Sequence, residues 1–454
     1  MRVVITGATV VSMDDEIGVL RDADIVVDDG VIQSVGPRAE HADAVDATGF
    51  IAVPGFVNAH LHTWQTALRG IASNWTLLEY FRWTHAGLAT FFTPDDIHHG
   101  TLAGALNQLN CGTTTLADWC HNNPTPEHTD AAVDALDRSG IRATFLHGSP
   151  KPDPKPGEPP YWEVPHPRAE IERLAAQPRF AGGLLSLGLA VLGPQYATVD
   201  VVVADGELAK ETGLVTSMHQ GGGLPKAPEG WAELERRNLL GPLVNIVHGH
   251  DLTDDQLRRF VDLGVTFTVT PENEMSQGHG HPLVGRLRDQ GGSPSLGIDL
   301  ESFVSGEMFA AARSALAHQR AMDNAEFRAA ARPGEPPIPD APSLTTADAL
   351  RWITLDGARM LGQADRIGSL TPGKRADLVL IDARLPNMQP VHDPVNAVVM
   401  QTSLANIDSV MVDGRWRKRH GILLDRTGAR LDLQTWLEPL RRSATRITSA
   451  IGLS

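Results

Sequence analysis

The stretch FVNAHLH, residues 56–62, decides the fold, and it follows the apolar run FIAV, Pro54 and Gly55. Side chains alternate along a β-strand, so His60 and His62 leave the same face of this predicted strand, with Cα atoms roughly 6.6 Å apart. Two imidazoles at that separation can converge on one metal ion. Such a pair also arises by chance in a chain with 18 histidines. Two hydrogen-bonded histidines at a strand end are therefore the alternative.

Length and charge limit what the chain can be. Its 454 residues suffice for one large α/β domain and a smaller one. The net charge of −16 argues against a nucleic-acid or anionic-membrane partner, and no run approaches the ~20 apolar residues of a membrane span. Two cysteines, Cys111 and Cys120, are too few for a disulfide scaffold, so the cytoplasm is the expected location. We expect small-molecule partners and a homo-oligomer, a dimer or higher.

The middle of the chain alternates short apolar runs with helical segments. A helix is predicted to start at Pro94 after the N-cap Thr93 and to stop before Gly112, and the segment 252–264 is built in the same way. Eight apolar runs have the character of buried parallel strands: 55–62, 113–120, 142–149, 180–191, 214–221, 243–250, 266–273 and 294–301. This alternation predicts an α/β fold, a (β/α)8 TIM barrel, whose active sites lie at the C-terminal ends of the strands. A doubly wound open sheet is the alternative, but no glycine fingerprint for a dinucleotide follows the first of these strands.

β-rich pieces with turn signals flank this middle part on both sides. We expect residues 1–54 and 365–430 to form one small composite β-sandwich domain, and residues 55–364 to form the barrel. Residues 431–454 have helical periodicity and are predicted as a C-terminal helical tail. The proline-rich stretch 150–167 directly follows a strand end, where long insertions usually build a lid or a pocket wall.

Ionisable residues gather at the predicted C-terminal ends of the strands. The stability of the fold alone would not favour so many ionisable residues at one end of the barrel, because buried unpaired polar groups are costly. Neutral imidazoles with a carboxylate suit Zn²⁺ or Fe²⁺ and leave one position for water. The groups at these strand ends are His60 and His62, Asp118, His147, His219, His248 and His250, Glu272, and Asp299.

Two further HxH pairs compete with the first one. In VHGHD we favour His248 as the functional residue, and expect His250 to orient or pack. The pair in QGHGHP, His279 and His281, lies in a glycine-rich loop. We interpret His279 as part of the pocket lining, and a solvated loop is the alternative.

Several motifs resemble those of one enzyme superfamily. They are HLH after PGF, TALRG, CGTTTLAD, a histidine at the fifth strand end, the HGH strand, GID, and the closing IGSLTPGKRADLVLIDARLPNMQPVHDPV. Together they resemble the amidohydrolase superfamily, in the branch of cytosine and guanine deaminases and s-triazine chlorohydrolases, over nearly the whole chain. The resemblance implies a barrel, a composite sheet domain and one divalent metal, with zinc expected and iron as the alternative. The implied ligands are His60, His62, His219 and Asp299, and His248 would touch the metal-bound water or the substrate.

The chain departs from this branch at three places. Relatives with two metals use a carboxylated lysine at the end of the fourth strand, and FAGGLLSLGLAVLG contains no lysine, so one metal is expected. Deaminases of the branch typically carry a glutamate three positions after the fifth-strand histidine, where this chain has Gly222. The seventh strand reads TPENEMSQGHGHP instead of the usual cysteine-proline-serine pattern. These departures concern the reaction and not the fold.

The missing glutamate requires another proton donor. A metal of this kind lowers the pKa of bound water from roughly 15.7 to about 7, and Asp299 beside it can accept the proton and pass it on. For the leaving group the candidates are Asp299, His248 and Glu272, in that order. Glu272 is equally explained by an ion pair with a basic loop residue, and the sequence does not rank its neighbours Glu274 and Glu301.

Substrate recognition is predicted to come from loops around the first two strand ends. Gln65 lies three positions after His62 and can hydrogen-bond a ring or carbonyl atom. The other predicted pocket residues are Trp83, Trp119, His121 and His279. Their planar rings suit a flat ligand. Core packing is the alternative for aromatic residues at helical spacing.

These features predict a metal-dependent amidohydrolase-type hydrolase that acts on C–N bonds other than peptide bonds. It would use metal-activated water to displace an amine or another leaving group from a cyclic or heteroaromatic small molecule, as a deaminase does. One alternative is a metal-dependent lyase, such as a decarboxylase or dehydratase. A non-catalytic binding protein on the same fold is the other alternative.

Overall fold

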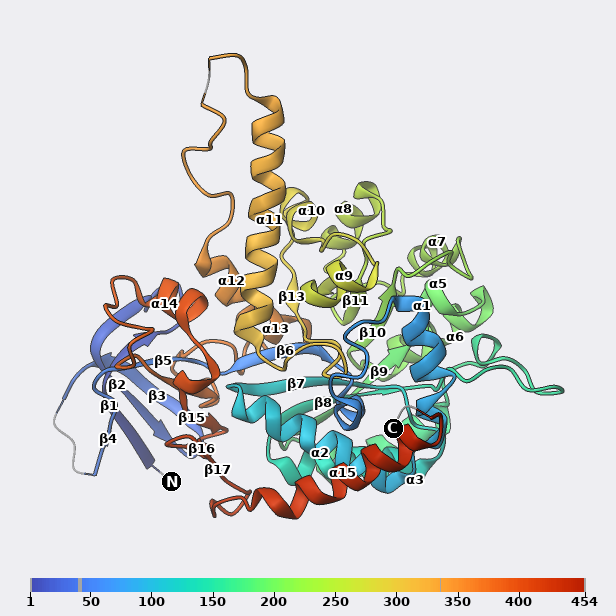
Figure 1. Cartoon of the computed structure of the whole chain (residues 1–454), viewed down its shortest axis with the longest axis horizontal. Coiled ribbons are helices and arrows are strands. Elements are labelled where there is room, and N and C mark those ends of the chain that lie inside the picture. Colours follow the sequence, from blue (N-terminus) through green and yellow to red (C-terminus); the bar gives the residue numbers. More distant parts are fainter. Residues whose placement is uncertain (1, 40–42, 335, 453–454) are drawn as a thin grey trace.

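The computed structural model of the chain describes residues 2–39, 43–334 and 336–452. It contains an eight-stranded parallel sheet with surrounding helices and, beside it, a separate mixed sheet built from both chain ends (Figure 1). The predicted TIM barrel with a composite β domain is therefore confirmed. The exact domain limits remain a prediction, and residues 1, 40–42, 335 and 453–454 of the predicted ranges lie outside the described residues.

The barrel strands follow one another in chain order, each parallel to the next. They are β6 (Phe56–Leu61), β7 (Thr113–Cys120), β8 (Arg142–Gly148), β9 (Leu185–Val191), β10 (Thr216–Gln220), β11 (Val244–His248), β12 (Thr266–Val269) and β13 (Ser295–Leu296). The last strand is short, and the ring closes just beyond it through a bridge between Leu61 and Asp299. The Asp299 N–H donates to the His60 carbonyl at 2.9 Å, and the His62 N–H donates to the Asp299 carbonyl at 2.9 Å. Closure thus places Asp299 beside the two histidines of β6.

Helices connect the strands and cover the outside of the barrel (Figure 1). Both helix predictions are confirmed, because Thr93 and Thr253 form capping boxes at the starts of α2 and α8. From the first strand to the ring closure the α-helices are α1 (Leu77–Tyr80), α2 (Pro94–Asn110), α3 (Pro126–Ser139), α4 (Arg168–Ala175), α5 (Gly193–Tyr196), α6 (Val199–Thr212), α7 (Gly230–Arg236), α8 (Asp254–Asp262), α9 (Pro271–Gln277) and α10 (Val284–Asp289). Those that follow are α11 (Met308–Ala330), α12 (Thr346–Trp352), α13 (Leu355–Met360), α14 (Pro394–Gln401) and α15 (Leu433–Ser449).

The second sheet joins the two ends of the chain. Its strands are β1 (Arg2–Val11), β2 (Val19–Asp28), β3 (Val31–Pro37), β4 (Val45–Asp46), β5 (Phe50–Pro54), β14 (Leu378–Asp382), β15 (Ile407–Val412), β16 (Arg415–Arg419) and β17 (Ile422–Leu423). The join is the antiparallel pairing of β5 with β14. The sheet has its own apolar core, which includes Ile5, Ile25 and Ile32. Because β5 leads into β6 across a single residue, Gly55, this sheet fixes where the first barrel strand begins.

Two helices extend the structure beyond the barrel. The C-terminal helix α15 runs along α2, where Ile447 is buried and Arg446 pairs with Asp96 (Figure 1). Helix α15 therefore packs on the barrel of the same chain. Helix α11 projects away from the body, and its distal half exposes Phe327. Across the described ranges, the helices are too short or too polar to cross a lipid bilayer.

A buried ion pair links the barrel to the second sheet. On β8, the Arg142 Nε donates to Asp377 Oδ2 at 2.7 Å and its Nη2 donates to Asp377 Oδ1 at 3.1 Å. Arg142 and Asp377 are both almost fully buried, and Arg142 Nη2 also reaches Asp413 at 3.0 Å. The pair fixes the second sheet on the flank of the barrel.

We expect the substitution Arg142→Met to destabilise the protein by about 3–5 kcal/mol, because it leaves the Asp377 carboxylate buried without its partner. Arg168→Met is the matched control, since Arg168 forms an exposed pair with Glu211 that is worth at most about 1 kcal/mol. Urea unfolding of both variants checks the difference. Equal losses of stability in the two variants would contradict the structural role of the buried pair.

Candidate active site

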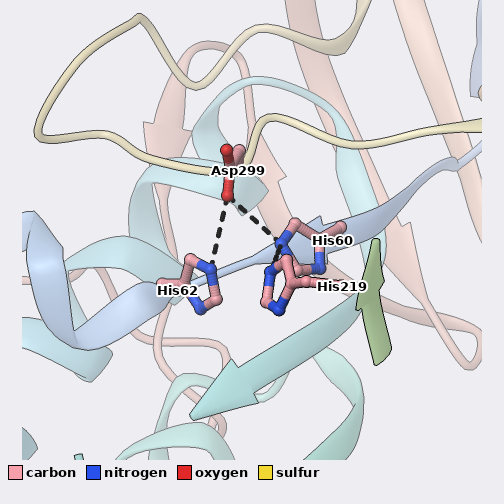
Figure 2. Close-up of side chains that lie close together, drawn as sticks. All are labelled: His60, His62, His219 and Asp299. Atoms are coloured by element: carbon pink, nitrogen blue, oxygen red, sulfur yellow. Dashed lines mark hydrogen bonds and ion pairs between the residues drawn. The ribbon is translucent and has the colours of Figure 1, made fainter. Parts of the chain in front are cut away.

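Four side chains from distant segments converge at the C-terminal mouth of the barrel. His60 comes from β6, His62 directly follows its last residue, His219 comes from β10, and Asp299 comes from the closing bridge (Figure 2). One ligand atom from each lies within 4.8 Å of all the others. The sequence-predicted metal ligands are thus brought together in the fold.

The separations of these atoms fit a metal ion. His60 Nε2 lies 3.2 Å from His219 Nε2 and 3.2 Å from Asp299 Oδ1, and His62 Nε2 lies 3.3 Å from Asp299 Oδ1. Ligand atoms about 2.0–2.1 Å from one zinc ion stand roughly 3–4 Å apart, and a shell of four protein ligands can expand to five to admit water. The donor set of three imidazoles and one carboxylate also matches what zinc and Fe²⁺ accept. Both the distances and the chemistry therefore suit one divalent ion.

Neighbouring groups orient two of the ligands. His62 Nδ1 lies 2.6 Å from the Trp119 carbonyl, which only accepts, so Nδ1 carries the proton and the Nε2 lone pair faces the other ligands. The amide of Asn273 donates to Asp299 Oδ2 at 3.0 Å, which leaves Oδ1 for the metal. Asn273 lies on α9, in the TPEN segment, and was not identified from the sequence.

Burial sets the charges at this site. It lowers the pKa of His60 to about 3 and that of His219 well below its usual value. Burial also tends to raise the pKa of Asp299, but its interactions with the neighbouring rings of His60 and His62 outweigh burial and hold this pKa well below the usual range. At neutral pH His60 and His219 are therefore neutral and Asp299 is ionised, which are the forms that bind metal.

The sixth strand adds a histidine–carboxylate pair. His248 ends β11 with a φ of 66°, and its Nδ1 lies 3.0 Å from Glu274 Oε1. The Thr270 N–H donates to the same oxygen at 2.9 Å. Burial lowers the pKa of His248 to about 4 and raises the pKa of Glu274 to about 7, so near neutral pH the ring is neutral and the carboxyl group is partly protonated.

The predicted position of Glu272 requires a correction. The seventh strand was expected to run to residue 273, but β12 stops at Val269 and Pro271 opens helix α9. Positions two apart on a helix face different sides. Glu272 accordingly faces α11, where Ser314 donates to it, whereas Glu274 faces His248. Glu274, which the sequence could not rank, is thus the carboxylate of this strand end that borders the site.

An inner pocket adjoins the metal ligands. It has a free volume of about 30 Å³ and borders an outer chamber of about 920 Å³ that the loop after β10 helps to form. Leu77, Gln277 and His279 line both spaces. The full lining of the inner pocket is His62, Leu77, Tyr80, Phe81, His85, His121, Lys151, Tyr196, His219, His248, Gln277, His279 and Asp299.

The predicted substrate-binding residues divide between the pocket and its supports. His121 and His279 line the pocket, and the ring of His121 stacks on that of His62 with centroids 4.2 Å apart. Trp119 packs beneath the ligands, with its ring centroid 4.4 Å from that of His219. Trp83 lies outside the lining and stacks with Arg82 instead.

Gln65 supports the pocket without lining it. Its amide nitrogen donates to the Tyr80 hydroxyl at 2.6 Å, and its amide oxygen accepts from Ser302 at 2.9 Å. Tyr80 in turn lines the pocket. Gln65 therefore holds a pocket residue in place, and its own polar atoms are occupied.

Other strand-end candidates have structural partners. The Glu301 carboxylate accepts hydrogen bonds from Asn107 at 2.8 Å and Gln108 at 3.1 Å, and it pairs with Arg69. His147 bonds to the ring of His166 at 3.1 Å. These contacts occupy the polar atoms of Glu301 and one ring nitrogen of His147, and neither residue lines the inner pocket.

Several pocket residues were not identified from the sequence. Lys151, Tyr196 and Gln277 line the pocket but lie on loops or short helices after strand ends. For Lys151 a signal existed, because it lies three residues beyond β8 at the start of the proline-rich stretch predicted to form a pocket wall.

Gly222, which stands where the glutamate is missing, has an unusual backbone conformation. Gly222 has a φ of 95°, which side-chain-bearing residues rarely adopt. A Cβ added there would lie 2.8 Å from a methyl carbon of Leu77. Glycine is thus required by the backbone at this point of the loop after β10.

Comparison with known proteins identifies the class. A model of the amidohydrolase family matches residues 51–417, so the chain belongs to the amidohydrolase family. It is a metal-dependent hydrolase of the deaminase-like type that acts on C–N bonds, and the resemblance predicted from the sequence is confirmed.

Individual relatives cover almost the whole chain. The 5-methylthioadenosine/S-adenosylhomocysteine deaminase of Symbiobacterium thermophilum is 28% identical, over 91% of this chain and 93% of its own length. The 8-oxoguanine deaminase of Pseudomonas aeruginosa is 28% identical, over 87% and 89%.

Solved structures share the fold at lower identity. A zinc-bound adenosine deaminase of Xanthomonas campestris matches with a TM-score of 0.80 at 23% identity, over 98% of each chain. The zinc complex of atrazine chlorohydrolase from Arthrobacter aurescens TC1 matches with a TM-score of 0.79 at 22% identity, over 97% of this chain and 100% of its own.

We expect Asn273→Ala to weaken metal binding by about 10- to 100-fold, because Asp299 loses the donor that orients its carboxylate. Asn324→Ala, on the exposed part of α11, is the control. Competition with a chelator of known affinity measures the change in metal affinity. An unchanged affinity in Asn273→Ala would show that Asp299 needs no such support.

Proposed function

We propose that this protein is a mononuclear zinc hydrolase that removes an amine from a heteroaromatic small molecule. The observation that carries the proposal is the convergence of His60, His62, His219 and Asp299 within 4.8 Å. Among the described residues, these four form the group of histidine, cysteine or acidic side chains whose ligand atoms lie close enough together to hold one metal ion. The absence of lysine from β9 supports one metal instead of two.

The chain's own groups divide the proton transfers. A bound zinc ion would supply acidified water at neutral pH. Asp299 is placed to accept a proton from the attacking water, with its other oxygen held by Asn273. The His248–Glu274 pair is placed to supply a proton to the leaving nitrogen, with Glu274 as the member that is partly protonated near neutral pH and His248 as the ring that lines the pocket; a glutamate at position 222 serves this role in other deaminases. Both groups line or back the same pocket.

The pocket supports a flat, polar substrate. Tyr80, Phe81 and Tyr196 supply aromatic walls. The side-chain polar atoms of Gln277 and His279 have no protein partner within the described part of the chain and are available to a ligand. The curated relatives are named as deaminases of adenosine derivatives and of 8-oxoguanine. An amino-substituted nitrogen heterocycle is therefore the proposed substrate class.

The expected metal content is one zinc ion per chain, measured by elemental analysis of the purified protein. Turnover should stop on exhaustive chelation and return when zinc is restored. Screening amino-substituted heterocycles for ammonia release in ¹⁸O-labelled water should place one labelled oxygen in the product, since hydrolysis takes its oxygen from water. A product that forms without label would instead favour a lyase reaction.

The roles of the two neighbouring glutamates can be separated. We expect Glu274→Gln to lower kcat by about 100-fold or more with little change in KM, since His248 loses its carboxylate partner. Glu272→Gln is a matched control, because its side chain faces α11, and should retain activity. Metal content of both variants should stay at the wild-type level. Loss of activity in Glu272→Gln alone would reverse the assignment.

We further propose an oligomer located in the cytoplasm. The projecting end of α11 exposes Phe327, and Ile338 in the following loop is 68% exposed, which is typical of residues that pack against another subunit. Cys111 and Cys120 are both buried free thiols, consistent with a reducing compartment. Light scattering should give at least twice the mass of one chain, and Phe327→Glu should lower it.

A further inference from the structure

Lys151 places a buried ammonium group in the active-site pocket. It lies three residues after β8, is only 8% exposed, and lines the inner pocket with His219, His248 and Asp299. The proposed mechanism gives it no task. Its position beside the metal ligands makes it a candidate for contact with the substrate.

The ammonium of Lys151 is surrounded by rings instead of oxygens. Its Nζ lies 4.4 Å from the ring centroid of Tyr196, 5.6 Å from that of Trp119 and 5.9 Å from that of Phe81. Aromatic faces offset part of the cost of burying a cation. They do not replace the hydrogen-bond acceptors that three N–H groups require. Burial accordingly lowers the pKa of Lys151 to about 8.

Two other lysines that are shielded from solvent have hydrogen-bond acceptors within the protein. Lys418 Nζ donates to the Asn110 carbonyl at 2.8 Å, and Lys374 Nζ donates to the Ile367 carbonyl at 3.4 Å and also to Ala364. Among the described residues, no hydrogen bond or ion pair joins Lys151 Nζ to an acceptor. The fold therefore leaves this one ammonium available.

The carboxylates near the pocket cannot serve as its partner. Asp299 Oδ2 accepts from Asn273, and Oδ1 lies among the imidazole nitrogens of His60 and His62. Glu274 bonds to His248. In the described structure these carboxylates are engaged by other groups, which leaves the ammonium of Lys151 free to bind water or an acceptor on a ligand.

We propose that Lys151 binds an anionic oxygen of the substrate, so that the preferred substrates are heterocycles with a carboxylate or an ionised oxygen on the ring edge. In this arrangement Phe81 and Tyr196 contact the ring, and the ammonium reaches the charged atom at its edge. The inference rests on the proposed function for treating this pocket as the substrate site. It narrows the substrate class from amino-substituted heterocycles in general to acidic ones.

Binding of matched anionic and neutral probes tests the inference. The probes are orotate against uracil and nicotinate against nicotinamide, titrated calorimetrically into the zinc-loaded full chain. We expect at least one anion to bind wild type about 10-fold or more tightly than its neutral partner, as a charged hydrogen bond requires. Lys151→Met should abolish that preference, and Lys151→Arg should keep most of it. Lys155→Met, an exposed lysine of the same loop, is the control and should behave as wild type.

Two outcomes would overturn the inference. One is a wild-type protein that prefers neither anion. The other is an unchanged preference in Lys151→Met, which would mean that the metal alone holds the anion. Should a thermal scan show that Lys151→Met does not fold, the wild-type protein provides the test. A bound anion should then protect Lys151 from reductive methylation, and a lack of protection would overturn the inference. This test measures binding and not turnover. A failure to release ammonia would therefore contradict the proposed function without changing the conclusion about Lys151.

Discussion

The active site depends on how the barrel closes. The eighth strand is only two residues long, and the ring is completed by backbone hydrogen bonds that Asp299 exchanges with His60 and His62. These bonds fix the carboxylate and the first histidine pair relative to each other, although 237 residues separate His62 from Asp299. His219 enters from β10 on the opposite part of the ring. The backbone hydrogen bonds that close the barrel thus also bring the predicted metal ligands together.

Around this centre, the fold holds groups in states that they would not adopt in water. Asp299 and His248 both have positive φ values, 64° and 66°, and a non-glycine residue in that region costs about 1–3 kcal/mol. Neutral imidazoles face one another at 3.2 Å, and an ammonium lies among rings. The buried cores of the barrel and of the second sheet offset these local costs. At this mouth of the barrel, two strained backbone positions and a buried ammonium thus lie beside the residues that would bind ligands.

The sequence could predict the barrel from short-range rules, whereas the set of four clustered side chains came from the resemblance to the amidohydrolase superfamily. Alternation along β6 places His60 and His62 on one face, and strand ends of a parallel barrel share one rim. The failure at Glu272 has a local cause, since Pro271 starts a helix where an extended strand was expected, and the helix turns position 274 to the pocket. The exact contacts of Gln65 and Lys151 could not be predicted for another reason. Their roles depend on Tyr80 and Tyr196, contacts between loops that no periodicity encodes.

The backbone at Gly222 has a consequence for the history of this enzyme group. A φ of 95° is a conformation that a glutamate rarely adopts, so a single codon change at this position would strain the loop before it could restore a proton shuttle. Restoring a glutamate here therefore requires a change in the backbone of the turn after β10 as well as the new side chain. The opposite substitution, glutamate to glycine, meets no such barrier, because glycine adopts both signs of φ.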